Sequence, residues 1–125
     1  MMSELGAICT QVSDDTATFV VPSTPMVPNP NGSVNGGIVV AIADQMMGLL
    51  ASRIASPGHL AATGTLNAQF HSPALAPLTV RGNVVRFGRR LTFVEVIVED
   101  RDGGRCASCQ GTMVAGAALR PARGD

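Results

Sequence analysis

The stretch from Asn35 to Ile54 constrains the fold of this chain more than any other. It contains no proline and many good helix formers, and Asn35 can cap a helix that starts with the pair Gly36-Gly37. Apolar residues occupy all sides of the predicted helix, which indicates that it is buried. Asp44 lies in the middle of this run, where an unpaired charge would be costly. Its carboxylate must therefore be hydrogen-bonded, paired or protonated, which makes Asp44 the first candidate functional residue.

The rest of the chain predicts mainly β-strands. Residues 6–13 and 16–21 predict a hairpin, and residues 22–34 carry four prolines and predict a loop. After the Ser56-Pro57-Gly58 break, strands are expected over residues 60–72, 78–87, 91–100 and 105–115, and residues 116–125 are expected to form a frayed tail. Residues 91–100 show the clearest period-two alternation, and Asp102-Gly103-Gly104 predicts a hairpin turn after them.

This order of elements predicts an α+β fold in one domain over residues 1–125. A single long antiparallel sheet that curves around one central helix satisfies the order, because only a curved sheet covers a helix on most sides. The helix face that remains and the open sheet edges then need a partner. A second copy of the chain supplies both, by pairing sheet edge to sheet edge and helix to helix.

The composition excludes several functional classes. The formal net charge is zero and all nine basic residues are arginines, which argues against a nucleic-acid or membrane-surface partner. The lack of lysine excludes a Schiff-base mechanism and a P-loop lysine. With no Trp, no Tyr and four Phe, an aromatic platform for stacking single-stranded bases is not expected.

The cysteines and the N-terminal residues predict a cytoplasmic protein. Cys9, Cys106 and Cys109 are too few, and odd in number, for a disulfide framework, and residues 1–15 lack the pattern of a signal peptide. The helix is too short and too interrupted to span a bilayer, so no membrane partner is expected. Cys106 and Cys109 are three positions apart on a predicted strand and so face opposite ways, which predicts neither a metal site nor a redox pair.

A series of short motifs spans nearly the whole chain. In order, they are Asn29, Gly32, Asn35-Gly36-Gly37, Asp44 eight residues after Gly36, residues 63–73 with their Ser72-Pro73 end, Gly88-Arg89-Arg90-Leu91 and the hairpin at residues 100–104. This series resembles the hotdog-fold acyl-CoA thioesterases, in particular the phenylacetate-pathway (PaaI-like) branch of the 4-hydroxybenzoyl-CoA thioesterase superfamily. The resemblance implies a hotdog fold, an acyl-CoA substrate that contains coenzyme A, and no separate cofactor or metal.

The resemblance also implies roles for individual residues. Gly36 resembles the position whose backbone N–H meets the thioester carbonyl, and Asn29 the asparagine that polarises this carbonyl or orients water. Asp44 resembles the catalytic carboxylate, and Thr63 the hydroxyl residue that positions water. Many family members have histidine directly before the glycine pair, where this chain has Asn35. An asparagine there can still donate a hydrogen bond or cap the helix.

The chemistry of thioester hydrolysis is compatible with these roles. Negative charge develops on the carbonyl oxygen, and a helix N-terminus offers N–H groups and a favourable dipole to stabilise it. Asp44 can act as a general base or as a nucleophile. At about 1.5 Å per residue, Gly36 and Asp44 lie roughly 12 Å apart along the helix, too far to grip one carbonyl group. We therefore expect two antiparallel helices to build composite sites in a homodimer, with a dimer of dimers as the larger form.

Other residues are expected to contact the substrate. They are Asn35, Gly37 and Met47 around the thioester and acyl group, and Arg86, Arg89 and Arg90 at the phosphates of coenzyme A. The three arginines have an alternative interpretation as solvated turn residues.

Three alternatives to this function remain open. Asp44 could be a structural acid bonded to a neighbouring hydroxyl, or the chain could bind acyl-CoA without turnover. A hotdog hydratase or dehydratase fits less well, because no histidine lies within five residues of Asp44. A thiol-release assay over aryl, short-chain and long-chain thioesters of coenzyme A separates the possibilities.

Overall fold

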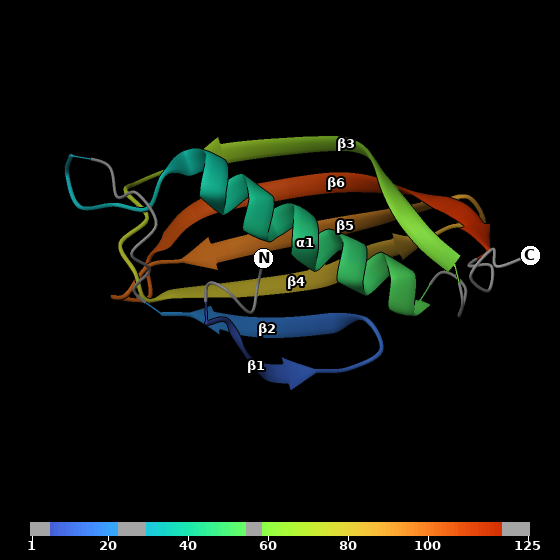
Figure 1. Ribbon diagram of the computed structural model, residues 1–125, viewed down its shortest axis with the longest axis horizontal. Helices are drawn as coiled ribbons and strands as arrows, with labels where there is room; N and C mark the ends of the chain where they lie inside the picture. Colours follow the sequence, from blue (N-terminus) through green and yellow to red (C-terminus); the bar gives the residue numbers. More distant parts are fainter. Residues whose placement is uncertain (1–5, 23–29, 55–58, 119–125) are drawn as a thin grey trace, which may run out of the picture.

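The computed structural model describes residues 6–22, 30–54 and 59–118 of the chain. Its elements are β1 (Ile8–Val12), β2 (Thr16–Val21), α1 (Gly36–Ile54), β3 (His59–Phe70), β4 (Leu78–Phe87), β5 (Leu91–Glu99) and β6 (Arg105–Ala118). The six strands form one sheet in the order β1-β2-β4-β5-β6-β3, and every neighbouring pair is antiparallel. Figure 1 shows α1 lying across one face of this sheet. The predicted fold, one long antiparallel sheet with one central helix, is confirmed.

Several strand ends differ from the sequence prediction by one to three residues, and the pairing explains two of them. β3 ends at Phe70 rather than at residue 72, because the backbone N–H groups of His71 and Ser72 both turn to the carbonyl oxygen of Cys106. β6 continues to Ala118, beyond the predicted end at residue 115, because it stays paired with β3 up to His59. The rest of the predicted tail, most of the proline-rich loop and the break at residues 56–58 lie outside the described residues.

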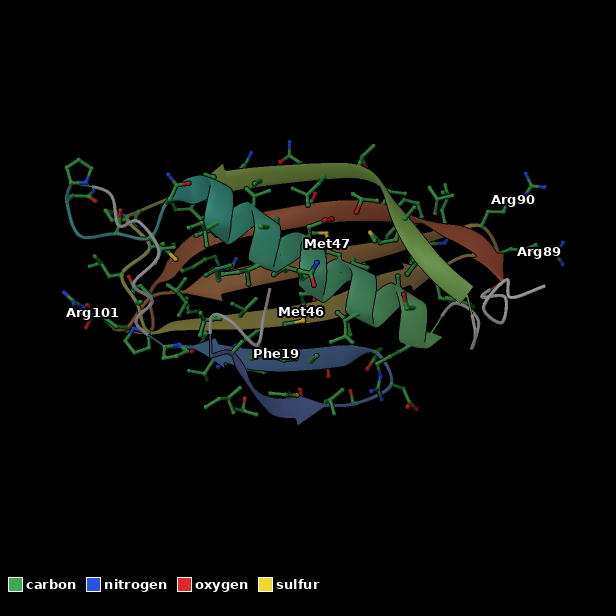
Figure 2. The ribbon with its side chains drawn as sticks, viewed as in Figure 1. Phe19, Met46, Met47, Arg89, Arg90 and Arg101 are labelled. Atoms are coloured by element: carbon green, nitrogen blue, oxygen red, sulfur yellow. The ribbon has the colours of Figure 1, made fainter. Side chains whose placement is uncertain are left out.

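The core lies between α1 and the sheet. The alternation predicted for β5 is confirmed, since Thr92, Val94, Val96 and Val98 are all buried on the helix side. Two methionines of the helix, Met46 and Met47, are labelled in Figure 2. Both fit against glycines of the sheet. Met47 Sδ occupies the place that a Cβ atom on Gly111 would take, and Met46 Cγ would lie 2.7 Å from a Cβ atom on Gly82. These two glycines therefore let the helix pack closely on the sheet.

The helix face that points away from the sheet is exposed in the single chain. Gln45, Leu49 and Arg53 lie on it, and Leu49 is 40% exposed. Asp44 is half-buried, whereas the all-round apolar sequence predicts a buried position. The reason is geometric, because one sheet covers only one face of the helix. Within the described residues, no helix is long and apolar enough to cross a lipid bilayer.

The sheet has two free edges, and they differ in length. β1 has five residues, all exposed, whereas β3 has twelve residues and lies along the other edge. A long unpaired edge strand is a template for pairing with another chain. β3 therefore offers the larger surface for adding a second sheet.

Candidate active site

The start of α1 is capped by Asn35. Its side-chain Oδ1 accepts a hydrogen bond from the Gly37 N–H at 2.8 Å, and its carbonyl oxygen accepts from Ile38 and Val39. This arrangement is an N-cap, so the predicted capping role is confirmed. Gly36 is the first helical residue. Its N–H is one of the first N–H groups of the helix, which have no acceptor within the helix. The helix dipole favours negative charge at this end.

Phe70 lies directly against this helix start. A Cβ atom on Gly36 would come within 3.3 Å of Phe70 Cζ, so glycine at this position leaves room for the ring. Gly36, Phe70, His71 and Asn31 are among the residues lining a hollow of about 370 Å³. Phe70 is 50% exposed there. The contact between Phe70 and Gly36 joins residues far apart in the chain, so the sequence alone did not predict it.

Asp44 is held by Thr63. The Thr63 hydroxyl donates a hydrogen bond of 2.5 Å to Asp44 Oδ1, which links the middle of α1 to the edge strand β3. No other hydrogen bond within the described residues reaches the Asp44 carboxylate, so Oδ2 remains available to a water molecule or a substrate. The structure thus brings together two of the predicted site residues in an oriented, half-exposed pair.

Gly36 and Asp44 stay apart in the single chain. They lie on one continuous helix, eight positions from each other, which corresponds to about 12 Å along its axis. One chain therefore cannot present both groups to the same carbonyl.

The candidate phosphate-binding arginines lie at the other end of the sheet. Arg89 and Arg90 are exposed in the β4–β5 turn, at the end opposite to the helix start (Figures 1 and 2). Arg86 is exposed near the end of β4 and lines a hollow of about 560 Å³ with residues of the sheet face that α1 does not cover. The three arginines also line a second surface hollow of about 480 Å³ at the turn. Within one chain they are far from the Gly36 N–H.

Met47 is 0% exposed and packs between α1 and the sheet, so in the single chain it belongs to the core. Asn29 lies outside the described residues.

The two cysteines of β6, Cys106 and Cys109, are free thiols and both are buried. Burial raises the pKa of the Cys106 and Cys109 thiols, and the Asp100 carboxylate adds to the effect on Cys106. Thiols with a raised pKa stay protonated at neutral pH and are poor nucleophiles. Among the described residues, no group of three or more His, Cys, Asp or Glu side chains is placed to hold a metal ion.

Comparisons with known proteins agree with this architecture. The family model of the thioesterase superfamily matches residues 31–107. The proofreading thioesterase EntH of Klebsiella pneumoniae subsp. pneumoniae is 29% identical over 119 residues, which cover 93% of this chain and 86% of EntH.

Two solved structures share the fold. The PaaI protein from the phenylacetic acid degradation operon of E. coli has a TM-score of 0.83 and 18% identity, covering 94% of this chain and 85% of PaaI. A hypothetical thioesterase protein with coenzyme A from Streptococcus pneumoniae has a TM-score of 0.83 and 18% identity, covering 96% of this chain and 94% of that protein. The family model covers well over half of the sequence and includes Gly36, Asp44 and Thr63. This chain therefore belongs to the thioesterase superfamily, as a hotdog-fold enzyme that hydrolyses thioesters.

Proposed function

We propose that this enzyme hydrolyses an aryl- or medium-chain acyl-CoA at a site built from two chains, with Asp44 as its catalytic carboxylate. The observation that carries the proposal is the hydrogen bond from Thr63 to Asp44 Oδ1. It fixes the orientation of a carboxylate that is half-buried and still has one oxygen available. An oriented acid next to an open face is what a general base or a nucleophile requires.

The Gly36 N–H is the hydrogen-bond donor to the thioester carbonyl in the proposed site. When a nucleophile attacks the thioester, negative charge collects on the carbonyl oxygen, and a fixed N–H donor at a helix N-terminus stabilises it. Asp44 then either takes a proton from the attacking water or attacks the carbonyl itself. In the second case it forms an anhydride that water hydrolyses afterwards, and both routes release coenzyme A as a thiol.

In this proposal, pairing along β3 brings Gly36 of one chain close to Asp44 of the other. If the β3 strands of two copies pair antiparallel about a two-fold axis, the helix start of one chain lies at the same end as the Arg89-Arg90 turn of the other. Gly36 of one chain then faces Asp44 of its partner, and each dimer contains two such sites. The pairing also covers the longer free edge of the sheet. We extend the proposal to a dimer of such dimers.

The names of the relatives support the choice of substrate class. EntH is a proofreading thioesterase, PaaI comes from a phenylacetic acid degradation operon, and the Streptococcus pneumoniae protein was solved with coenzyme A. This chain has three exposed arginines, Arg86, Arg89 and Arg90. Their guanidinium groups can bind the phosphates of coenzyme A. In the proposed site, Asn35 and Gly37 line the thioester, Asn29 helps to polarise it, and Met47 lies behind the acyl pocket.

A thiol-release assay tests the proposed function. The wild-type enzyme is given acetyl-, hexanoyl-, benzoyl- and phenylacetyl-CoA, and we expect catalytic release of free coenzyme A, fastest with an acyl group larger than acetyl. Binding of these thioesters without release of thiol would identify a carrier protein instead. Hydration of an enoyl-CoA without release of thiol would identify a hydratase.

Replacing Thr63 with valine tests the pair that carries the proposal. Valine has nearly the same shape but no hydroxyl, so Asp44 loses the donor that orients it. Loss of a hydrogen bond to a charged group lowers an equilibrium or rate constant by about 10- to 100-fold. We expect kcat of the valine variant to fall by this factor. The Thr63→Ser variant retains the donor and is expected to stay within about threefold of wild type. Equal activity of the valine and serine variants would show that the hydroxyl has no part in turnover.

Removing charge at the β4–β5 turn tests coenzyme A recognition. The Arg89→Ala and Arg90→Ala variants are expected to raise KM for acyl-CoA by about tenfold, because a charge-assisted hydrogen bond to phosphate is lost. Thioesters of N-acetylcysteamine lack the nucleotide, so their KM is expected to be unchanged. Arg81→Ala is the matched control, because Arg81 is paired with Glu99 elsewhere on the sheet. The same rise in KM for both types of thioester would identify Arg89 and Arg90 as ordinary turn residues.

A further inference from the structure

The helix contains three glycines, and the packing of the chain explains two of them. A Cβ atom on Gly36 would press on the Phe70 ring at 3.3 Å, and one on Gly37 would lie 3.0 Å from the capping oxygen of Asn35. Gly48 is different, because among the described residues a Cβ atom there would meet only Met113 Cε, at an ordinary contact distance of 3.9 Å. Glycine within a helix is less stable than alanine. The packing of the single chain thus gives no reason for this glycine.

The position of Gly48 relates it to the proposed site. Asp44, Gly48 and Ser52 are spaced by four residues and so share one helix face. This face points to β3, since Asp44 accepts a hydrogen bond from Thr63 and Ser52 Oγ accepts one from the Ala61 N–H at 3.4 Å. Gly48 therefore lies beside β3, one helical turn from the Asp44 carboxylate and between these two hydrogen bonds.

The surroundings of Gly48 are small and apolar. Ala61 of β3 is half-buried and packs against the core on the same side. Met113 reaches up from β6, and its terminal methyl group is the atom nearest to Gly48 outside the helix. Methionine is flexible and adapts its shape to a ligand. Met47, which sequence reasoning assigned to this role, instead points into the sheet at Gly111.

We propose that Gly48 determines acyl specificity: its missing side chain leaves space beside Asp44 for the apolar part of a bulky acyl group, with Met113 as the adjustable wall. The inference rests on the proposed function and deepens it by naming the feature that admits acyl groups larger than acetyl. An aryl or medium-chain group attached to the carbonyl would extend from Asp44 along the helix, over Gly48 and toward Ser52. A side chain at position 48 would occupy that path.

The variants Gly48→Ala and Gly48→Val test the inference through substrate preference. The quantity measured is the ratio of kcat/KM for phenylacetyl-CoA to kcat/KM for acetyl-CoA. One added methyl group in an apolar pocket changes discrimination by about 10- to 200-fold, so the alanine variant is expected to lower the ratio at least about tenfold and the valine variant further. The Tm of Gly48→Ala is expected to rise by about 3–5 °C, because alanine stabilises the helix. That rise would exclude misfolding as the cause.

Gln45→Ala is the matched control, since Gln45 is exposed on the helix face that points away from the sheet. It should leave the ratio within about twofold of wild type, as surface substitutions usually have small effects. An unchanged ratio in both Gly48 variants would overturn the inference. Equal losses for every thioester, together with dissociation of the dimer, would also overturn it and would assign Gly48 to contact between the two helices.

The proposed function can fail separately from this inference. If the wild-type enzyme releases no thiol from any acyl-CoA, the proposed function is wrong. The inference is then tested by thermal shift, using Kd values for the same thioesters. Weaker binding of phenylacetyl-CoA relative to acetyl-CoA in Gly48→Ala would support it, and equal relative binding would reject it.

Discussion

The Asp44→Asn variant is expected to lose about 10²- to 10⁴-fold in kcat, the usual contribution of a positioned acid or base. The amide keeps an acceptor oxygen for the Thr63 hydroxyl, so the link between α1 and β3 is retained. What it loses is the ability to take a proton from water or to attack the thioester. Because Asp44 is half-buried and has one hydrogen-bond partner among the described residues, its replacement should leave the Tm within a few degrees of wild type.

Steady-state kinetics with phenylacetyl-CoA, together with a thermal melt, measure both effects. Glu95→Gln is the matched control, since it removes a carboxylate charge on β5 away from Asp44 and should leave kcat unchanged. A kcat of the Asp44→Asn variant within threefold of wild type would identify Asp44 as a structural acid.

The Gly36→Pro variant is expected to lose about 10²- to 10³-fold in kcat, the effect of removing one oxyanion-hole donor. Proline is tolerated at the first position of a helix, where its fixed φ suits the helix and its missing N–H breaks no intrahelical bond. The substitution therefore deletes the N–H proposed to bind the carbonyl oxygen and leaves the helix in place. The Phe70 ring must move by a few tenths of an ångström to admit the proline Cβ, and its exposure allows this movement.

The Gly36→Ala variant is the matched control for the added carbon atom. Alanine places a Cβ against Phe70 in the same way but keeps the N–H, so the difference in kcat between the alanine and proline variants measures the loss of the N–H and its replacement by the ring carbons of proline. Circular dichroism should show the same helix content in both. Equal kcat values for the two variants would exclude the Gly36 N–H from carbonyl polarisation.

The sequence predicted the fold well because its signals are local. The proline-free stretch after Asn35 and the alternation along β5 each depend on neighbours in the chain, and both appear in the structure as predicted. The sequence signal for the turn at residues 100–104 is also local. Gly103 has a φ of 82°, and Asp100 Oδ1 accepts hydrogen bonds from the N–H groups of Asp102 and Gly104.

The candidate site was predicted less completely because its geometry depends on distant elements. The sequence could not show that the sheet covers only one face of α1, so it predicted more burial for Asp44 than the structure has. It could not show that Met47 fits over Gly111 while Met113 approaches Gly48, since each contact joins a helix residue to a strand far along the chain. The separation of Arg89 and Arg90 from Gly36 likewise follows from the direction of the helix relative to β4 (Figure 1).

Complementation between two inactive variants tests the shared site most directly. When Asp44→Asn and Gly36→Pro chains are co-expressed with different affinity tags, half of the dimers contain one chain of each. In such a heterodimer, one site combines both defects, while the other pairs an intact Gly36 with an intact Asp44. The purified heterodimer should therefore recover about half of the wild-type kcat per dimer, whereas each parent homodimer remains inactive. A heterodimer as inactive as its parents would show that each chain builds its own site and would contradict the composite arrangement.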